Sequence, residues 1–123
     1  MPGTTPKRLG FARAKRLKQG RDFARTRHEG QRAVQGCLIV NWRRLPADAA
    51  TRLGVVTSKK IGGAVVRTRA RRLLREVFRL HQGELTQPVD LVLVARQSIV
   101  GRELAQVEKD FLTTMSRVGL VNL

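Results

Sequence analysis

The strongest structural signal in the chain lies in residues 59–79, which read KKIGGAVVRTRARRLLREVFR. Apolar residues recur in this stretch at helical spacing, which predicts an amphipathic helix from Ala64 to His81. Its apolar face comprises Val66, Ala70, Leu73, Leu74, Val77 and Phe78. Its opposite face is cationic and carries Arg71, Arg72, Arg75 and Arg79, with Arg67 and Arg69 beside the apolar stripe.

The cationic face indicates a polyanionic partner. Glu76 is the only acidic residue of the helix, whereas a solubilising face usually mixes both signs and forms i,i+4 pairs. The whole chain has the same bias, because 25 Lys and Arg against nine Asp and Glu give a net charge of +16 in 123 residues. Such an excess repels itself unless a polyanion neutralises it. We therefore expect nucleic-acid binding, with an ordinary solvated face as the alternative.

The residues before the helix favour a phosphate site. Gly62 and Gly63 would let the backbone approach a ligand closely, and the helix N-terminus supplies unpaired N–H groups beside Lys59 and Lys60. The segment is not a Walker loop, because the Gly-Lys-Ser/Thr ending is absent. A plain helix-capping turn explains the glycines equally well, so both interpretations stay open.

The whole pattern predicts an α/β (α+β) two-layer sandwich in the order α-β-β-β-α-β-α, with about four strands and three helices. A basic arm at 1–14 would precede a single domain at 15–123. Asp22 would cap the first helix, and Gly30 would end it. The expected elements are a helix at 23–28, one or two strands at 33–44, a strand at 52–57, the helix at 64–81, a central strand at 89–95 and a last helix at 101–118. The last helix has an apolar stripe that should face the core, formed by Leu104, Val107, Phe111, Leu112, Met115 and Val118.

Other chemistry is sparse. Cys37 is the only cysteine, so we expect neither a disulfide framework nor a Cys-based metal site, but a buried, inert thiol in a strand and a reducing, cytoplasmic compartment. His28 and His81 are isolated and the acids are scattered, which gives no sign of a catalytic triad or a two-metal carboxylate site. The apolar run at 89–95 is far too short to span a bilayer.

Residues 58–76, SKKIGGAVVRTRARRLLRE, resemble the signature of the bacterial ribonuclease P protein family. They match without a gap the family's Ser-Lys-Lys, Gly, Ala-Val, Arg-Asn-Arg, Lys/Arg-Arg and Arg-Glu. The likeness extends over about residues 15–118 and includes Arg16-Leu17-Lys18, Asp22-Phe23 and Gly30. Thr68 departs from the pattern, because it puts one hydroxyl on a stiffer side chain where the family has an amide.

The resemblance implies a division of labour between RNA and protein. An RNA subunit, ribonuclease P RNA, would hydrolyse a phosphodiester of precursor transfer RNA with Mg²⁺, and the protein would bind that RNA and the single-stranded 5′ leader. It also implies a left-handed β-α-β crossover, which no sequence rule predicts. The residues facing the RNA subunit would be Lys59, Lys60, Arg67, Thr68, Arg69, Arg71, Arg72 and Arg75.

The leader would lie in a cleft between the sheet and the first helix. Phe23 matches the family's cleft aromatic and could stack on a base, although a core role is the equal alternative. Arg27 and Asn41 stand where other members can present aromatics, so the resemblance implies more reliance on charge and hydrogen bonds.

Two other functions fit the same charge and size. A structural RNA binder such as a ribosomal protein is one, although the ordered signature around Arg67 argues against it. A DNA-binding helix-turn-helix is the other, although the segments beside the cationic helix have the pattern of strands.

Overall fold

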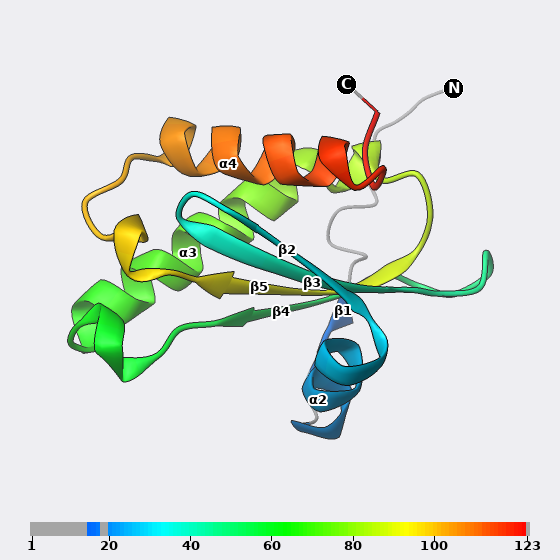
Figure 1. Ribbon diagram of the computed structural model, residues 1–123, viewed down its shortest axis with the longest axis horizontal. Coiled ribbons are helices and arrows are strands. Elements are labelled where there is room, and N and C mark those ends of the chain that lie inside the picture. Colours follow the sequence, from blue (N-terminus) through cyan, green and yellow to red (C-terminus); the bar gives the residue numbers. More distant parts are fainter. Residues whose placement is uncertain (1–14, 18–19, 123) are drawn as a thin grey trace.

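The computed structural model describes residues 15–17 and 20–122 (Figure 1). The strands are β1 (Lys15–Arg16), β2 (Gln31–Gln35), β3 (Leu38–Arg44), β4 (Arg52–Val56) and β5 (Val89–Ala95). The helices are α2 (Gly20–Glu29), α3 (Ala64–His81) and α4 (Leu104–Arg117). Short 3₁₀ turns occupy Lys59–Ile61, Gln82–Glu84 and Gln97–Ile99. The arm predicted at 1–14 lies outside the described residues.

The strands form one mixed sheet in the order β1-β4-β5-β3-β2. The first three strands of that order are parallel to one another, whereas β3 is antiparallel to both β5 and β2. The predicted order of elements and the central place of β5 are confirmed, and the two-residue β1 is an additional edge strand. Helix α3 connects β4 to its parallel neighbour β5. Strand order does not define the hand of this crossover, so its left-handed sense stays a prediction.

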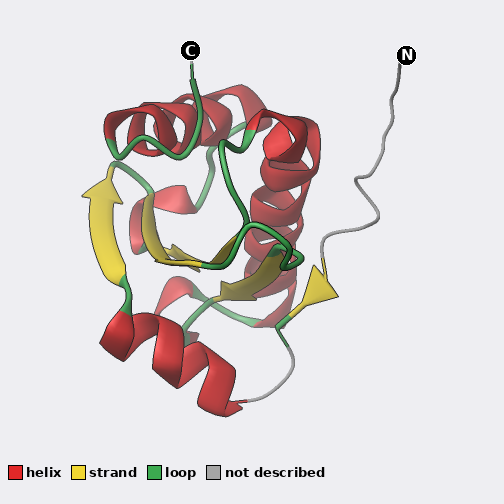
Figure 2. Ribbon diagram, turned by 90° about the vertical axis from the view of Figure 1, so that its right-hand side faces the viewer, coloured by secondary structure: helices red, strands yellow, loops and turns green. Residues whose placement is uncertain are grey.

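Helices α3 and α4 cover one face of the sheet, and α2 crosses the other (Figures 1 and 2). The hydrophobic core lies under α3 and α4, where alternate strand residues such as Val40 and Leu91 enter it. The predicted apolar stripes of both helices are confirmed, since Leu74 of α3 and Phe111 and Met115 of α4 are buried there. The opposite face of the sheet is left partly open beside α2, and the candidate site lies on that face.

The segment predicted as one or two strands at 33–44 forms two, β2 and β3, which begin at Gln31 and are joined by a tight turn at Gly36 and Cys37. Gly36 has a φ of 54°, in the left-handed region that glycine adopts without strain. The Cys37 N–H donates to the carboxylate of Asp110 at 2.9 Å, which holds Cys37 in the turn and not in the strand expected for it. The thiol is fully buried as predicted, and this burial, followed by the hydrogen bond to Asp110, raises the pKa of Cys37 to about 11.

Helix α2 begins at Gly20, earlier than predicted, so the expected N-cap role of Asp22 is wrong. Asp22 instead lies in the first turn, where its charge suits the positive end of the helix dipole. The predicted stop is confirmed, because the Gly30 N–H donates to the Thr26 carbonyl at 3.0 Å and the helix ends one residue earlier. A Cβ atom at Gly30 would overlap the backbone oxygens of Thr26 and Trp42, so only glycine fits at this point.

Candidate nucleic-acid interface

A network of ion pairs holds α2 against the sheet. Asp90 of β5 is fully buried, and its carboxylate accepts hydrogen bonds from Arg52 Nε at 2.8 Å and Arg52 Nη2 at 2.7 Å. Arg43 of β3 donates to the same carboxylate at 3.0 Å. Arg52 also lies 3.5 Å from the carboxylate of Asp22 in α2. A buried carboxylate is tolerated only when such partners satisfy it, so the network ties three strands to the first turn of α2.

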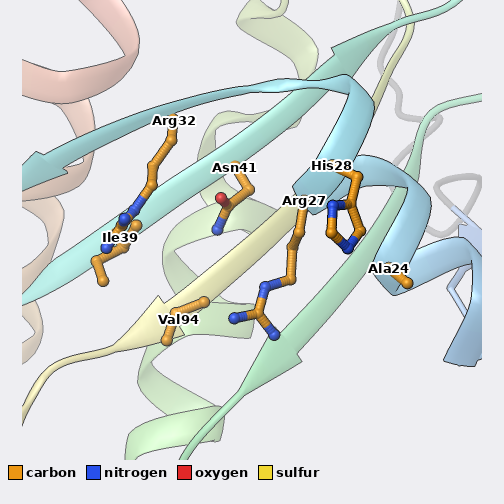
Figure 3. A pocket seen from close by; sticks show the side chains of 7 residues that line it. All are labelled: Ala24, Arg27, His28, Arg32, Ile39, Asn41 and Val94. Carbon is orange, nitrogen blue, oxygen red and sulfur yellow. The ribbon is translucent and has the colours of Figure 1, made fainter.

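A groove of about 520 Å³, here named the α2 groove, opens between α2 and the sheet (Figure 3). Ile39 and Val94 are register partners on β3 and β5 and supply an apolar floor. Arg27 and Asn41, both predicted for a leader cleft, are brought together here, and their side chains point into the hollow (Figure 3). The full lining is Ala24, Arg27, His28, Arg32, Ile39, Asn41 and Val94.

Phe23 occupies a different place from the other two residues predicted for the cleft. It lies outside the residues that line the α2 groove and is half-buried. Its ring covers Gly54 of β4 so closely that a Cβ atom there would lie 2.6 Å from the ring carbons. This contact favours a packing role for Phe23, and its stacking on a base stays a prediction.

The cationic face of α3 and its preceding turn present side chains without acidic partners. Lys59, Lys60, Arg72 and Arg75 are exposed, and Arg67 is half-buried. All nine acidic residues of the chain are among the described residues, and none of them forms an ion pair with these five side chains.

Strand β1 brings a further cation to this face. Burial, followed by the charges of Arg16 and Arg71, lowers the pKa of Arg75, which shows how closely the positive groups are crowded. A guanidinium remains charged at neutral pH despite such a shift. Around Lys59, Lys60, Arg67, Arg72 and Arg75, the face is therefore a dense positive surface to which the described residues supply no acidic partner.

Two of the predicted arginines are already engaged within the protein. Arg69 Nη2 donates to the backbone oxygen of Arg102 at 2.7 Å, which ties α3 to the segment before α4. Arg71 donates to the hydroxyls of Thr57 at 2.9 Å and Thr68 at 3.3 Å. Thr68, at the position of the family's Asn, thus helps to orient Arg71.

Arg79 also differs from the expectation that the arginines of this face lack partners. Its Nε and Nη2 donate to the two carboxylate oxygens of Glu76 at 2.9 and 2.7 Å. The i,i+3 spacing brings these residues onto neighbouring turns of the helix. The expectation is therefore wrong for Arg79 and holds for Arg72 and Arg75.

The N-terminus of α3 has the geometry of a backbone cap. The Arg67 N–H donates to the Gly63 carbonyl at 3.0 Å, and no side chain caps the helix. Gly62 has a φ of 152°, and the lysines before it lie in an exposed 3₁₀ turn. These observations agree with a capping turn and leave phosphate binding at this point a prediction.

Strand β4 leads along the chain from beside the α2 groove to the turn before α3. Val56, the last residue of that strand, is the register partner of Val94 in the groove floor. The chain then passes through Thr57 to Lys59 and Lys60 and enters α3. The elements that flank α3 include strands on both sides, which does not fit a helix-turn-helix.

His81 is not isolated, contrary to the expectation from the sequence. Its Nδ1 lies 2.8 Å from a carboxylate oxygen of Glu84, and its Nε2 lies 2.6 Å from one of Glu108 in α4. Burial disfavours the charged ring, but these two hydrogen bonds outweigh it and raise the pKa of His81.

The described residues contain no group of three or more His, Cys, Asp and Glu placed to hold a metal. None of the described helices has both the length and the apolar character needed to cross a membrane.

Several residues of the interface were missed from the sequence. Alternation along a strand could have placed Ile39 with Asn41 on one face, but the run Leu38-Ile39-Val40 is uniformly apolar and conceals it. The resemblance included Arg16 with the first helix, but Arg16 lies in β1, and its place near α3 depends on the pairing of β1 with β4, which no local pattern predicts. The missed residues of the groove are Ala24, His28, Arg32, Ile39 and Val94.

Comparison with known proteins gives one family. The family model described as Ribonuclease P matches residues 11–119. A ribonuclease P protein component of Syntrophomonas wolfei is 35% identical over 105 residues, which cover 85% of this chain and 87% of the relative. One from Gluconacetobacter diazotrophicus is 34% identical over 109 residues, covering 88% and 94%.

Solved structures agree with the sequence comparison. The Staphylococcus aureus RNase P protein aligns with a TM-score of 0.79 at 27% identity, over 89% of this chain and 99% of that one. The Thermotoga maritima RNase P protein aligns with a TM-score of 0.74 at 28% identity, over 84% and 96%. The chain belongs to the ribonuclease P protein family.

Proposed function

We propose that this chain binds the RNA subunit of ribonuclease P through the cationic face of α3 and holds the 5′ leader of precursor transfer RNA in the α2 groove. The protein would assist removal of the leader, and catalysis would reside in the RNA subunit. Mg²⁺, held mainly by that RNA, would supply the activated water and stabilise the charge on the phosphodiester. The protein's own residues would bind and orient the two RNAs.

The observation that carries the proposal is the separation of paired from unpaired charge. The buried Asp90 pairs with Arg43 and Arg52, and Glu76 pairs with Arg79 on α3. In contrast, Arg72 and Arg75 have no acidic partner among the described residues. A folded RNA presents phosphates at a density that matches such a surface, and release of its counterions drives binding. The bidentate guanidinium suits phosphate better than a point charge does.

The α2 groove suits a single strand for a separate reason. Single-stranded RNA exposes the faces of its bases as well as its phosphates. Ile39 and Val94 offer an apolar surface for a base, and Arg27 and Arg32 offer donors to its edge or to phosphates. The leader would enter this groove while α3 stays on the RNA subunit, because the groove and α3 lie on different faces of the sheet.

Reconstitution tests the whole proposal. The full chain is mixed with a bacterial ribonuclease P RNA at low Mg²⁺, and leader removal from precursor transfer RNA is followed. We expect stimulation by the protein, since it supplies positive charge that Mg²⁺ otherwise provides. Absence of stimulation at every Mg²⁺ concentration would refute the proposal.

Salt dependence tests the α3 face by itself. Arg72→Ala and Arg75→Ala should each weaken binding of the RNA subunit and reduce the slope of log K against log salt by roughly 0.7 to 0.9 for each lost phosphate contact. Arg79→Ala is the matched control on the same helix, because Arg79 is paired with Glu76. Equal slopes for all three variants and the wild type would show that this face does not contact phosphate.

A further inference from the structure

The guanidinium of Arg71 is held in place by two threonine hydroxyls. Its Nη1 donates to Thr57 Oγ1 at 2.9 Å, and its Nη2 donates to Thr68 Oγ1 at 3.3 Å. Thr68 lies one turn earlier on α3, whereas Thr57 directly follows β4, so Arg71 is fixed both from its own helix and from the sheet. All three side chains are half-buried. We name this arrangement the threonine clamp.

The threonine clamp fixes the charge of Arg71 without neutralising it. Hydroxyls are neutral partners, and none of the nine acidic residues, all of which lie in the described part of the chain, forms an ion pair with Arg71. Arg79 on the same helix is the opposite case, because the carboxylate of Glu76 holds its guanidinium. The charge of Arg71 is felt one turn further on, since it contributes, after burial and the charge of Arg16, to lowering the pKa of Arg75. The clamp therefore presents an oriented cation whose counter-charge has to come from another molecule.

The remaining polar hydrogens of the clamp define the chemistry of its ligand. A guanidinium carries more N–H groups than the two used here, and each hydroxyl keeps its own proton while it accepts from Arg71. The groups left over are all donors, and they surround a positive charge. They suit an anion that offers several acceptor oxygens and no donor, which is the chemistry of a phosphodiester. The edge of a base suits them less, because most base edges present donors beside acceptors.

We propose that the threonine clamp is a preset site for one phosphate of the RNA subunit, with Arg71 as the binding group and Thr57 and Thr68 as the residues that position it. A free arginine side chain has many rotamers and loses that freedom when it binds, which weakens binding. In the clamp, the hydroxyls impose this order when the protein folds. The inference rests on the proposed function, because it assumes that α3 lies on the RNA subunit.

Affinity and salt dependence together test the clamp in the full chain. Thr57→Val removes the hydroxyl, keeps the shape of the side chain and leaves every charge in place. We expect it to weaken binding of the RNA subunit by about two- to tenfold, the cost of ordering one arginine, with an unchanged slope of log K against log salt. Thr57→Ser should restore the affinity, because it restores the hydroxyl. Arg71→Ala should lower the affinity and also reduce the slope by roughly 0.7 to 0.9.

A double-mutant cycle shows whether Thr57 acts through Arg71. In a protein that already carries Arg71→Ala, the change Thr57→Val should have almost no further effect on affinity. Thr68→Val should behave like Thr57→Val, and it replaces that variant if thermal unfolding shows Thr57→Val to be poorly folded. Thr86→Val is the matched control, because it removes a threonine hydroxyl that donates to the Gly119 carbonyl and has no contact with an arginine of α3. It should bind the RNA subunit like the wild type.

The outcomes separate this inference from the proposed function. Wild-type affinity for both Thr57→Val and Thr68→Val overturns the inference, and so does a loss from Thr57→Val that is equally large without Arg71. In either case the proposed function stands if Arg72→Ala and Arg75→Ala weaken binding. If those two variants and Arg71→Ala all bind like the wild type, the RNA subunit does not contact this face of α3, and both proposals fail.

Discussion

Replacing Asp90 with Asn should destabilise the protein more than any other exchange of a carboxylate for an amide on the α2 side of the sheet. Asp90 is 0% exposed, and its two oxygens accept three hydrogen bonds from Arg43 and Arg52. An amide keeps one oxygen and turns the other position into a donor. At least one arginine N–H would then face a donor, and both guanidiniums would lose their buried counter-charge.

The structure sets the size of the effect near the lower end of the range for broken buried ion pairs. Removing one partner of a fully buried pair costs about 3–5 kcal/mol. The side chains of Arg43 and Arg52 are 24% and 31% exposed, so water can partly replace the lost carboxylate. We therefore expect a loss of about 3 kcal/mol in the free energy of unfolding. For a domain of this size, that loss lowers Tm by roughly 10 °C.

Urea and thermal unfolding followed by circular dichroism would measure this loss. Glu29→Gln is the matched control, because it makes the same chemical change at an exposed residue of α2 whose partner Arg25 lies 4.0 Å away. That control should change the free energy of unfolding by less than about 0.5 kcal/mol. If Asp90→Asn falls within 1 kcal/mol of its control, on the scale of about 3 kcal/mol expected for a broken buried pair, the network is not what holds these strands and α2 together.

Three further outcomes follow from single sites. The pKa of His81 is raised in the folded protein, so its protonated ring stabilises the fold. This contribution is complete below the unfolded pKa of about 6.5 and is lost as pH rises through the higher folded pKa. His81→Gln should abolish that part of the pH dependence of the free energy of unfolding. Gly54→Ala should cost about 1–3 kcal/mol by forcing the ring of Phe23 off β4, whereas Gly20→Ala, where a Cβ meets nothing within 4 Å, should be neutral or stabilising in the same melts. Cys37 should resist thiol reagents in the folded protein and react in urea; rapid reaction of the native thiol would contradict its burial and its pKa of about 11.

Elements with strong local patterns could be predicted from the sequence. The bounds of α3 and of β5 agree with prediction, because an amphipathic period and a continuous apolar run each specify their element without help from distant residues. The start of α2 could not be predicted in this way. Asp22 is a good capping residue by local preference, but its pairing with Arg52, 30 residues away, places it inside the first turn.

The α2 groove shows the limit of sequence reasoning more clearly. Arg27 and Asn41 could be predicted as neighbours only from the family resemblance. One lies on a helix and the other on a strand, so no helix or strand periodicity relates their positions. Their meeting depends on the register of β3 with β5 and on the angle at which α2 crosses the sheet. The buried carboxylate of Asp90 links these elements through Arg43 and Arg52, and no local pattern predicts that link.

The arginines make the same point in terms of charge. In the sequence, Arg43 and Arg52 are as strong candidates for RNA contacts as Arg72 and Arg75, and the net charge of +16 counts all four alike. The fold commits the first two to Asp90 and leaves the second two facing outward without an acidic partner among the described residues. Charge composition can therefore predict that a polyanion binds, but not which arginines bind it. Salt dependence should consequently separate the two classes, because substitution of Arg43 or Arg52 lowers stability whereas substitution of Arg72 or Arg75 lowers the slope.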